Sequence, residues 1–151
     1  ITPSDPDFIV NIAVKKGIDK GDIFVKFAPR KELPVLISLS SVSIFFIKNT
    51  FSKKASSPTK QAELMGLGIP VIANSGIGDV DNVILKTESG KVINISDPSP
   101  YKEVCFNIDK LLEIKKEKIR KNGMAIFALE IGVNHYRKIY SRLEQLNWKL
   151  V

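Results

Sequence analysis

The alternation of short apolar runs with helical patterns restricts the fold of this chain more than any other feature. The apolar runs occupy residues 23–27, 42–47, 69–73 and 91–95. The helical patterns occupy residues 6–16, 32–40, 57–67 and 79–85, and helical spacing continues from Pro100 to the end of the chain. Such alternation is typical of α/β proteins with a parallel sheet. We therefore predict a Rossmann-like parallel sheet of about five or six strands, with helices on both faces and a C-terminal helical segment.

Two of the predicted helices carry recognisable start and stop signals. Asp5 is a favourable capping residue, Pro6 suits the first helical position, and Gly17 ends the pattern. The helix near residue 57 has Ser57 as its predicted cap and Gly68 as its end. Both helices should therefore begin and end close to these residues.

The whole chain, residues 1–151, is expected to form one domain, because a chain of this length buries one sizeable core. Apolar residues make up 44% and charged residues 26%, which argues against a disordered chain. No apolar run approaches the ~20 residues that cross a bilayer, and no signal-peptide pattern opens the sequence. Cys105 is the only cysteine, which excludes a disulfide framework and a cysteine-based zinc site. These features favour a cytoplasmic protein.

The first residues read like the end of a strand that enters a helix. No initiator methionine precedes them. We therefore expect a fragment that lacks the first strand of its domain and the part of the protein upstream of it.

The net charge of +7 admits two interpretations. A basic surface attracts the phosphates of nucleotides, nucleic acids or lipids, whereas a lysine-rich helix is also an ordinary solvated surface. Much of the charge lies in residues 110–121, which contain no aromatic residue and include Glu113 and Glu117. Sites for single-stranded nucleic acids usually add aromatic side chains that stack on bases. We favour a solvated helical face and expect no nucleic-acid partner.

The segment of residues 55–60 is a candidate diphosphate site, because it follows a predicted strand and leads into a helix. A helix N-terminus offers unpaired N–H groups and about half a positive charge. Hydroxyl groups and one ammonium group add to these donors; they belong to Ser56, Ser57, Thr59 and Lys60, with Pro58 between them. The alternative is a capped helix with an exposed lysine, and this segment alone does not decide between the two.

Glu63 lies one helical turn after Lys60. Beside a phosphate, a carboxylate suits ribose hydroxyls better than the phosphate itself, because it accepts hydrogen bonds and repels like charge. The alternative is a surface pair between Lys60 and Glu63, worth a few tenths of a kcal/mol. Both interpretations stay open at this point.

The turn at residues 74–79 contains Gly76 and Gly78. Glycine adopts backbone angles that other residues avoid and lets a ligand approach the main chain. The alternative, which the turn alone favours, is a plain strand-to-helix connection that Asp79 caps.

Taken together, residues 56–80 resemble the donor-site segment of GT-B-fold glycosyltransferases of the group 1 type, which consist of two Rossmann-like domains. The resemblance is strongest in ELMGLGIPVIA at residues 63–73, which is similar to the family's E-A-M-A-x-G-x-P-V-I-A run. Weaker similarity is found in FAPRKELP at residues 27–34 and in the ending at residues 129–146. The resemblance implies that this chain is the C-terminal, donor-binding half of a GT-B fold.

The resemblance also implies a role for each candidate residue. Glu63 would hold the ribose of a nucleotide diphosphate sugar, Ser57 to Lys60 would contact the phosphates or the sugar, and Pro29 and Arg30 would lie beside the base. The acceptor, a sugar or a lipid-linked glycan, would bind the missing N-terminal domain, so this fragment alone would be inactive. No metal or other cofactor is expected, because lysine, arginine and the helix dipole would stabilise the departing diphosphate. Contact with the cytoplasmic face of a membrane is expected only by analogy with enzymes that build lipid-linked glycans.

The sequence departs from the family pattern before Glu63. Many members carry a second glutamate eight positions earlier, where this chain has Ala55. That glutamate usually contacts the donor sugar, so the sugar, the stereochemical outcome and the catalytic residues are not assigned. Asp79 and Asp81 have the spacing of a metal motif, but they follow the glycine turn and we discount them.

Two other functions compete with the glycosyltransferase interpretation. A nucleotide-sugar epimerase shares the architecture but needs acid and base groups that this half scarcely offers. A flavodoxin-like interaction module needs a phosphoacceptor aspartate, for which Asp5 is the one weak candidate. A hydrolase is disfavoured because the serines lack a nucleophile elbow, and His135, the only histidine, is far along the chain from both loops.

Overall fold

The computed structural model describes residues 1–2 and 4–145. It divides the chain into two compact units, one of residues Ile1–Leu39 and the other beginning at Ser40. The expectation that residues 1–151 form one domain stays a prediction. Each unit is described by itself below.

The first unit contains α1 (Pro6–Lys15), a short 3₁₀ helix η1 (Lys20–Asp22) and α2 (Leu33–Ser38). The predicted ends of α1 are confirmed. The Asp5 carboxylate accepts a hydrogen bond from the Asp7 N–H at 3.0 Å, and Gly17 follows the helix at φ +86°. Asp5 is thus engaged as the cap of α1.

The strand predicted at residues 23–27 is wrong. This segment runs as extended chain without strand structure, and Phe24 and Phe27 are exposed. A strand needs a ladder of backbone hydrogen bonds to a neighbouring strand. Among the described residues, the Thr2 N–H donates to the Lys26 carbonyl at 3.1 Å, and no ladder of such bonds runs along residues 23–27.

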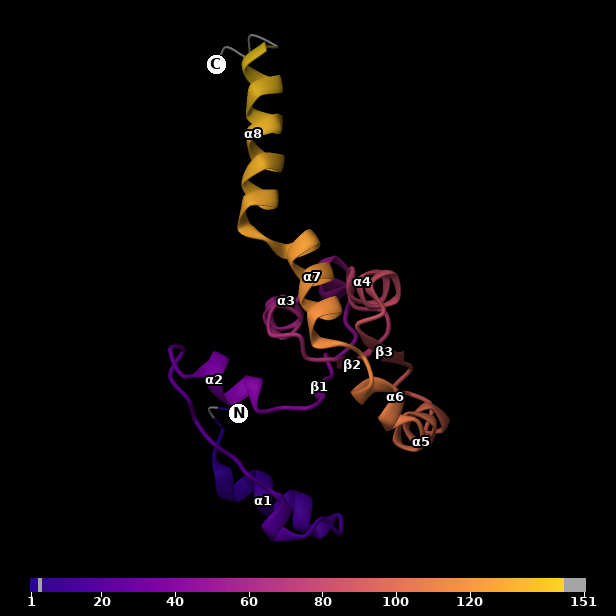
Figure 1. Cartoon of the computed structure of the whole chain (residues 1–151). Helices are drawn as coiled ribbons and strands as arrows, with labels where there is room; N and C mark the ends of the chain where they lie inside the picture. Colours follow the sequence, from indigo (N-terminus) through magenta and orange to yellow (C-terminus); the bar gives the residue numbers. More distant parts are fainter. Residues whose placement is uncertain (3, 146–151) are drawn as a thin grey trace. The chain divides into compact units, whose positions relative to one another are not determined.

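The second unit is built on a parallel sheet of three strands in the order β1-β2-β3 (Figure 1). These strands are β1 (Ser43–Phe45), β2 (Val71–Asn74) and β3 (Gly90–Ile93). The prediction of about five or six strands is therefore wrong for the described residues. The predicted runs at 42–47, 69–73 and 91–95 do form strands, with bounds shifted by a few residues.

Helices join the strands and cover both faces of the sheet (Figure 1). α3 (Thr59–Gly66) connects β1 to β2, and α4 (Val80–Thr87) connects β2 to β3. Ile72 and Ile93 pack with Val104 and Leu111 of α5 (Ser99–Phe106) and α6 (Ile108–Leu112). Adjacent strand residues point to opposite faces, so Val71 and Ala73 face the other side, where the crossover helices α3 and α4 lie. An α/β architecture with a helix-flanked parallel sheet, compatible with a Rossmann-like fold, is thus confirmed.

The helix α7 (Lys116–Phe127) closes the α3 and α4 side of the core. Ile119 of α7 is fully buried and packs with Met65 of α3 and Val83 of α4. Gly123 lies so close to α3 that a Cβ atom there would be 2.8 Å from the Met65 Cβ. Real Cβ contacts are not that short, so glycine permits this approach of the two helices.

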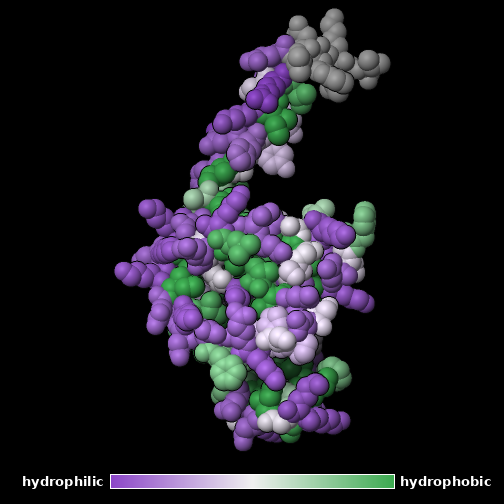
Figure 2. All heavy atoms as spheres, turned by 90° about the vertical axis from the view of Figure 1, so that its right-hand side faces the viewer, coloured by the Kyte–Doolittle hydropathy of each residue, from purple (hydrophilic) through white to green (hydrophobic). Residues whose placement is uncertain are grey.

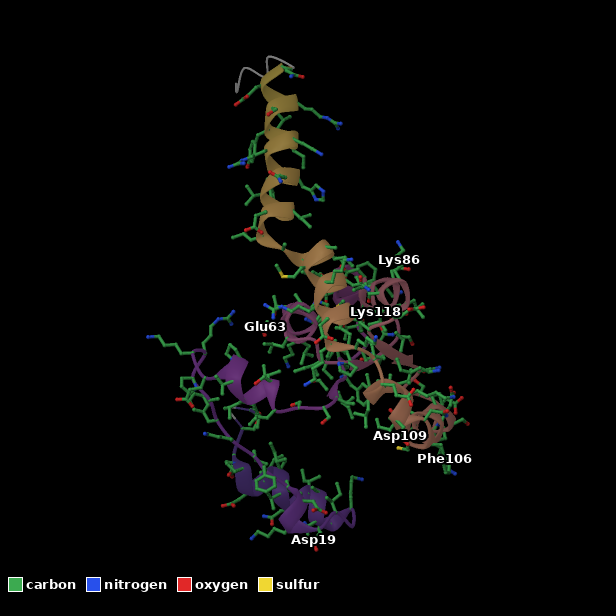
Figure 3. All side chains as sticks on the ribbon, viewed as in Figure 1. Asp19, Glu63, Lys86, Phe106, Asp109 and Lys118 are labelled. Carbon is green, nitrogen blue, oxygen red and sulfur yellow. The ribbon has the colours of Figure 1, made fainter. Side chains whose placement is uncertain are left out.

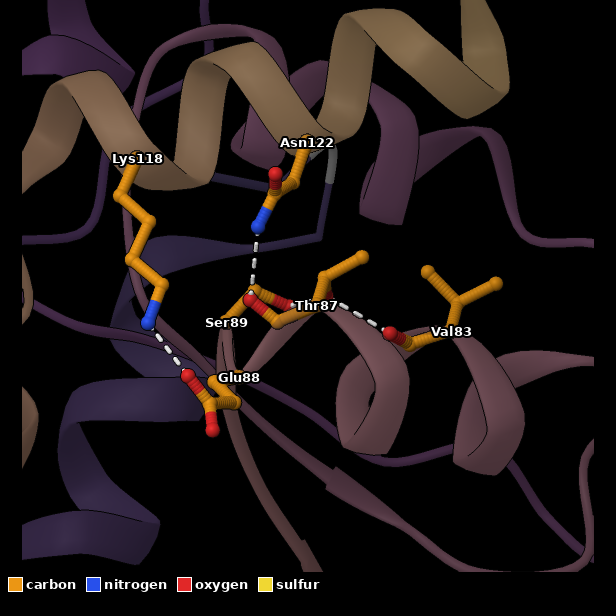
Figure 4. A network of polar contacts seen from close by, with 6 residues as sticks. All are labelled: Val83, Thr87, Glu88, Ser89, Lys118 and Asn122. Atoms are coloured by element: carbon orange, nitrogen blue, oxygen red, sulfur yellow. Dashed lines mark hydrogen bonds and ion pairs between the residues drawn. The ribbon is translucent and has the colours of Figure 1, made fainter.

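A polar network holds α7 to the end of α4 (Figure 4). Asn122 donates to the Thr87 carbonyl at 3.1 Å, and the Thr87 hydroxyl donates to the Val83 carbonyl at 2.6 Å. Lys118 forms an ion pair with Glu88, which ends α4 in the left-handed conformation at φ 50°. α7 is therefore attached by both apolar and polar contacts.

The last described helix, α8 (Leu129–Gln145), follows α7 after Ala128 and contains no buried residue. The predicted helical C-terminal third is confirmed up to residue 145. Within the described part of the chain, we find no helix with both the length and the apolar character that crossing a bilayer requires.

Candidate functional site

The candidate site lies where β1 and β2 end, the edge at which open parallel sheets bind ligands. We call this region the carboxyl edge and define it as residues 46–60 and 74–81. The first of these segments leads from β1 into α3 and includes the 3₁₀ helix η2 (Phe51–Ala55); the second leads from β2 into α4. The two candidate loops predicted from the sequence therefore begin at neighbouring strands.

Asn74 joins the two segments at their base. Its side chain is almost fully buried, and its Oδ1 accepts from the Ile47 N–H at 2.7 Å while its Nδ2 donates to the Ile47 carbonyl at 2.9 Å. A buried amide that is paired in this way fixes the main chain after β1. From the sequence, Asn74 was predicted only to begin a turn. Its buried role could have been inferred from the fact that a polar residue ends an otherwise apolar strand.

The glycine turn touches the segment after β1. At Gly78, φ is +44° and a Cβ atom would be 1.6 Å from the Ser56 carbonyl oxygen. At Gly76, φ is +80° and a Cβ atom would be 2.9 Å from Nδ2 of Asn49. Gly78 is therefore required for loop packing, because the backbone of Ser56 fills the space beside it, whereas Gly76 is favoured by its left-handed φ. Neither interpretation of this turn, ligand approach or a plain connection, anticipated that contact.

Ser57 also links the two loops, and its predicted capping role is wrong. α3 begins at Thr59, and its N-cap is Pro58, which provides no side-chain cap. Ser57 lies one position too early to cap, and its hydroxyl instead donates to Oδ2 of Asp79 at 3.0 Å. The start of α3 consequently has no capping side chain at its N-cap position, which leaves the positive end of the helix dipole without an internal acceptor there.

The segment after β1 is strongly basic. Residues 48–60 contain no acidic residue and four exposed lysines, namely Lys48, Lys53, Lys54 and Lys60. η2 carries Lys53 and Lys54 together with Phe51, whose side chain is 89% exposed. Positive charge and an exposed aromatic ring are thus combined on one short helix, a feature that the sequence analysis missed.

Two carboxylates at the start of α4 offset part of this charge. Oδ2 of Asp81 accepts from the Gly76 N–H at 3.2 Å, and Oδ2 of Asp79 accepts from Ser57. The Oδ1 atoms of both residues are buried and have no hydrogen-bond partner among the described residues. Because like charges repel, an anion at the carboxyl edge is favoured on the side of α3 and η2 and disfavoured beside Asp79 and Asp81.

On α3, exposed and buried side chains alternate as an amphipathic helix requires. Lys60 and Glu63 are exposed, and Figure 3 shows Glu63 on this helix. Gln61 is fully buried, and its Nε2 donates to the Val80 carbonyl at 3.5 Å, which connects α3 with the first turn of α4. Lys60 and Glu63 are neighbours on one helical surface. This arrangement is required if Lys60 binds a phosphate while Glu63 binds ribose, and it is also required if the two residues only form a surface pair.

Pro29 and Arg30 belong to the unit of residues 1–39. They lie in the exposed turn before α2, where the Glu32 N–H donates to the Pro29 carbonyl at 2.9 Å. Their expected position beside a nucleotide base stays a prediction.

The carboxyl groups with lowered pKa values are found outside the carboxyl edge. A hydrogen bond and the charge of Lys118 lower the pKa of Glu88, and Lys91 lowers the pKa of Glu103 in the same way. Hydrogen bonds from Ser99 lower the pKa of Asp97. These shifts come from ion pairs and a helix start, so they mark structural contacts and not a catalytic acid or base.

A hollow outside the carboxyl edge is also present. It has a volume of about 590 Å³, is open to solvent, and is lined by residues that include Leu85, Glu88, Gly90, Lys110 and Lys118. Gly90 begins β3, so this hollow lies at the amino end of that strand, opposite to the carboxyl edge. Lys118 is paired with Glu88 there, which reduces the positive charge that the hollow offers.

In the described residues, histidine, cysteine, aspartate and glutamate side chains nowhere gather in a group of three that could hold a metal ion. The expectation of a metal-independent reaction stays a prediction. Comparison with known proteins adds no identification. No protein-family model matches this chain, and neither a curated protein nor a solved structure matches it significantly.

Proposed function

We propose that the carboxyl edge binds the diphosphate of a nucleotide sugar, and that the chain is the donor-binding part of a glycosyltransferase. The observation that carries this proposal is the convergence of the basic segment 48–60 with the glycine turn at the carboxyl ends of β1 and β2. A diphosphate needs concentrated positive charge and N–H or hydroxyl donors. Four exposed lysines and the start of α3 supply these groups.

The residues fall into distinct roles under this proposal. Lys60 and Thr59 lie in the first turn of α3, so the ammonium group, the hydroxyl group and the helix dipole act on the same phosphate. Glu63, one turn later on the exposed surface, accepts hydrogen bonds from the ribose hydroxyls. Ser57 holds Asp79 and so positions the loop, leaving Ser56, Gly76 and Gly78 to shape its backbone.

The chemical consequence would be stabilisation of the leaving group. Transfer of the sugar releases a nucleoside diphosphate, whose charge increases as the bond to the sugar breaks. Lysines fixed at that position lower the barrier because they interact more strongly with the transition state than with the bound donor. The acceptor, the product and a cytoplasmic location are parts of the same proposal and rest on the resemblance of residues 63–73 to the family's donor segment.

The decisive experiment is calorimetric titration of the chain with UDP, GDP, ADP and their common sugar conjugates. We expect one nucleotide to bind. Glu63→Gln should weaken that binding at least about tenfold, which corresponds to ~1.4 kcal/mol. The matched control is Glu117→Gln on α7, which removes the same charge away from the carboxyl edge and should leave affinity unchanged. Equal effects of both variants, or no binding of any ligand, would contradict the proposal.

A further inference from the structure

The helix α8 presents an apolar stripe that the described structure leaves exposed. Its members follow one another at alternating steps of four and three residues, which places them on one face of a helix. They are Leu129, Val133, Tyr136, Tyr140 and Leu143, with Ile139 beside them. Their exposed fractions run from 36% for Val133 to 76% for Leu129. Figure 2 shows hydrophobic side chains along one side of α8 and hydrophilic ones along the other.

The remaining surface of α8 is mostly polar and carries a small excess of positive charge. Arg137, Lys138 and Arg142 lie outside the apolar stripe, together with the acidic Glu130 and Glu144. Over residues 110–145 the chain carries nine lysines and arginines and four acidic residues, a net charge of +5 out of the +7 of the whole chain. The positive charge of the protein is therefore concentrated in the part that ends in α8.

These features match a helix that lies in the plane of a membrane interface. Such helices combine an apolar face with a basic polar face and have low overall hydrophobicity. Among the described residues no helix is suited to span a bilayer, so α8 would lie on a membrane and not cross it. Anionic headgroups complement the net charge of residues 110–145, and each lysine or arginine near the surface strengthens binding about fivefold.

The tyrosines favour a membrane over a second copy of this chain as the partner. Tyr136 and Tyr140 occupy the middle of the stripe, where a helix-to-helix seam would bury their hydroxyl groups away from water. At a membrane interface the ring contacts acyl chains while the hydroxyl group stays among headgroups and water. Gly132, which has no neighbouring atom within 4 Å of an added Cβ, would also leave a gap in a packed seam.

We propose that α8 docks on an anionic membrane surface, with its apolar stripe inserted at the level of the headgroups and the net positive charge of residues 110–145 attracting the anionic lipids. This inference does not depend on nucleotide binding at the carboxyl edge. It rests on the exposure of the apolar stripe of α8 and on the net charge of residues 110–145.

Co-sedimentation of the full chain with vesicles tests this inference. We expect binding to phosphatidylcholine vesicles that contain phosphatidylglycerol at least about tenfold tighter than to pure phosphatidylcholine, and weakening with salt. The double variant Tyr140→Ser, Leu143→Ser should lose at least about tenfold in affinity for the anionic vesicles. The double variant Arg137→Gln, Lys138→Gln should lose a similar factor in affinity for anionic vesicles, and its affinity for neutral vesicles should be unchanged.

Folding does not confound this test, because α8 contains no buried residue. The matched control is Ser141→Ala on the polar side of α8, which should bind like the parent chain. Circular dichroism and urea unfolding should be equal for all variants. Failure of the parent chain to bind anionic vesicles would overturn the proposal. Equal binding of the Tyr140→Ser, Leu143→Ser variant and the Ser141→Ala control to anionic vesicles would also overturn it. A third contrary result would be a dimer of the parent chain in sedimentation equilibrium that becomes monomeric in the Tyr140→Ser, Leu143→Ser variant, while that variant still binds vesicles.

Discussion

The helices α7 and α8 follow one another and are both amphipathic and basic, yet only α7 belongs to a core. α7 buries Ile119 and Gly123 against α3, and its polar side is tied to the end of α4. α8 has a longer and more regular apolar stripe but buries none of it. The comparison teaches that periodicity establishes an apolar face, whereas a partner within reach decides whether that face is buried.

The largest expected effect compares one apolar side chain from each helix. Ile119→Ala removes a fully buried side chain that packs with Met65 and Val83, and should lower the free energy of unfolding by about 2–5 kcal/mol. Tyr140→Ala removes a side chain that is 62% exposed and should change it by less than about 0.5 kcal/mol. Urea unfolding of both variants measures the difference. Comparable losses would show that α8 has a folded partner.

A smaller effect compares the glycines of the two helices. Gly123→Ala places a Cβ atom against Met65 and should lower the free energy of unfolding by about 1–3 kcal/mol. Gly132→Ala in α8 meets nothing within 4 Å and should be neutral or stabilise the helix by up to about 1 kcal/mol. The midpoint of urea unfolding should therefore fall for Gly123→Ala and stay unchanged or rise for Gly132→Ala. A loss at Gly132 as large as at Gly123 would contradict the assignment of α8 as an unpacked helix.

The smallest effect concerns the ion pair that attaches α7. Lys118 lowers the pKa of Glu88 from its ordinary value of 4.5, so the folded chain favours the ionised carboxylate. The contribution of this pair to the stability of the folded chain is complete when the pH is above this ordinary pKa. It is lost as the pH falls through the lowered pKa of the folded state. Glu88→Gln should make the acid-induced loss of stability between about pH 5 and about pH 3 slightly shallower.

Lys118→Gln provides the second arm of that measurement. Removing the cation abolishes the same ion pair. The free energy of unfolding of this variant, plotted against pH, should therefore approach that of the parent chain at low pH. Parallel curves for parent and variants over the whole range would show that the pair contributes nothing to the attachment of α7.

Local signals predicted much of the fold. The capping aspartate and proline of α1, the apolar runs of β1 to β3 and the helical spacing after Pro100 all correspond to observed elements. These features depend on side chains close in sequence, for which spacing and capping chemistry suffice. The segment at residues 23–27 has equally favourable residues but forms no strand, because an extended chain becomes a strand only beside another.

The candidate site shows the same division. Residue types identified both loops of the carboxyl edge, because glycine, serine and lysine at strand ends have recognisable roles. The contact of Gly78 with Ser56, the bond between Ser57 and Asp79, and the pairing of Asn74 with Ile47 escaped prediction. Each joins residues more than twenty positions apart, and local spacing carries no information on such distances.

The sequence by itself determined which segments are helical or extended, where charge concentrates, and that α8 has an apolar face. Tertiary structure alone decided that Ser57 binds Asp79 and not the start of α3, that Gly123 permits the contact of α7 with α3, and that the described residues leave α8 uncovered. The physical reason is that backbone preferences act over a few residues. Burial and side-chain pairing, in contrast, depend on which distant segments the fold brings within contact distance.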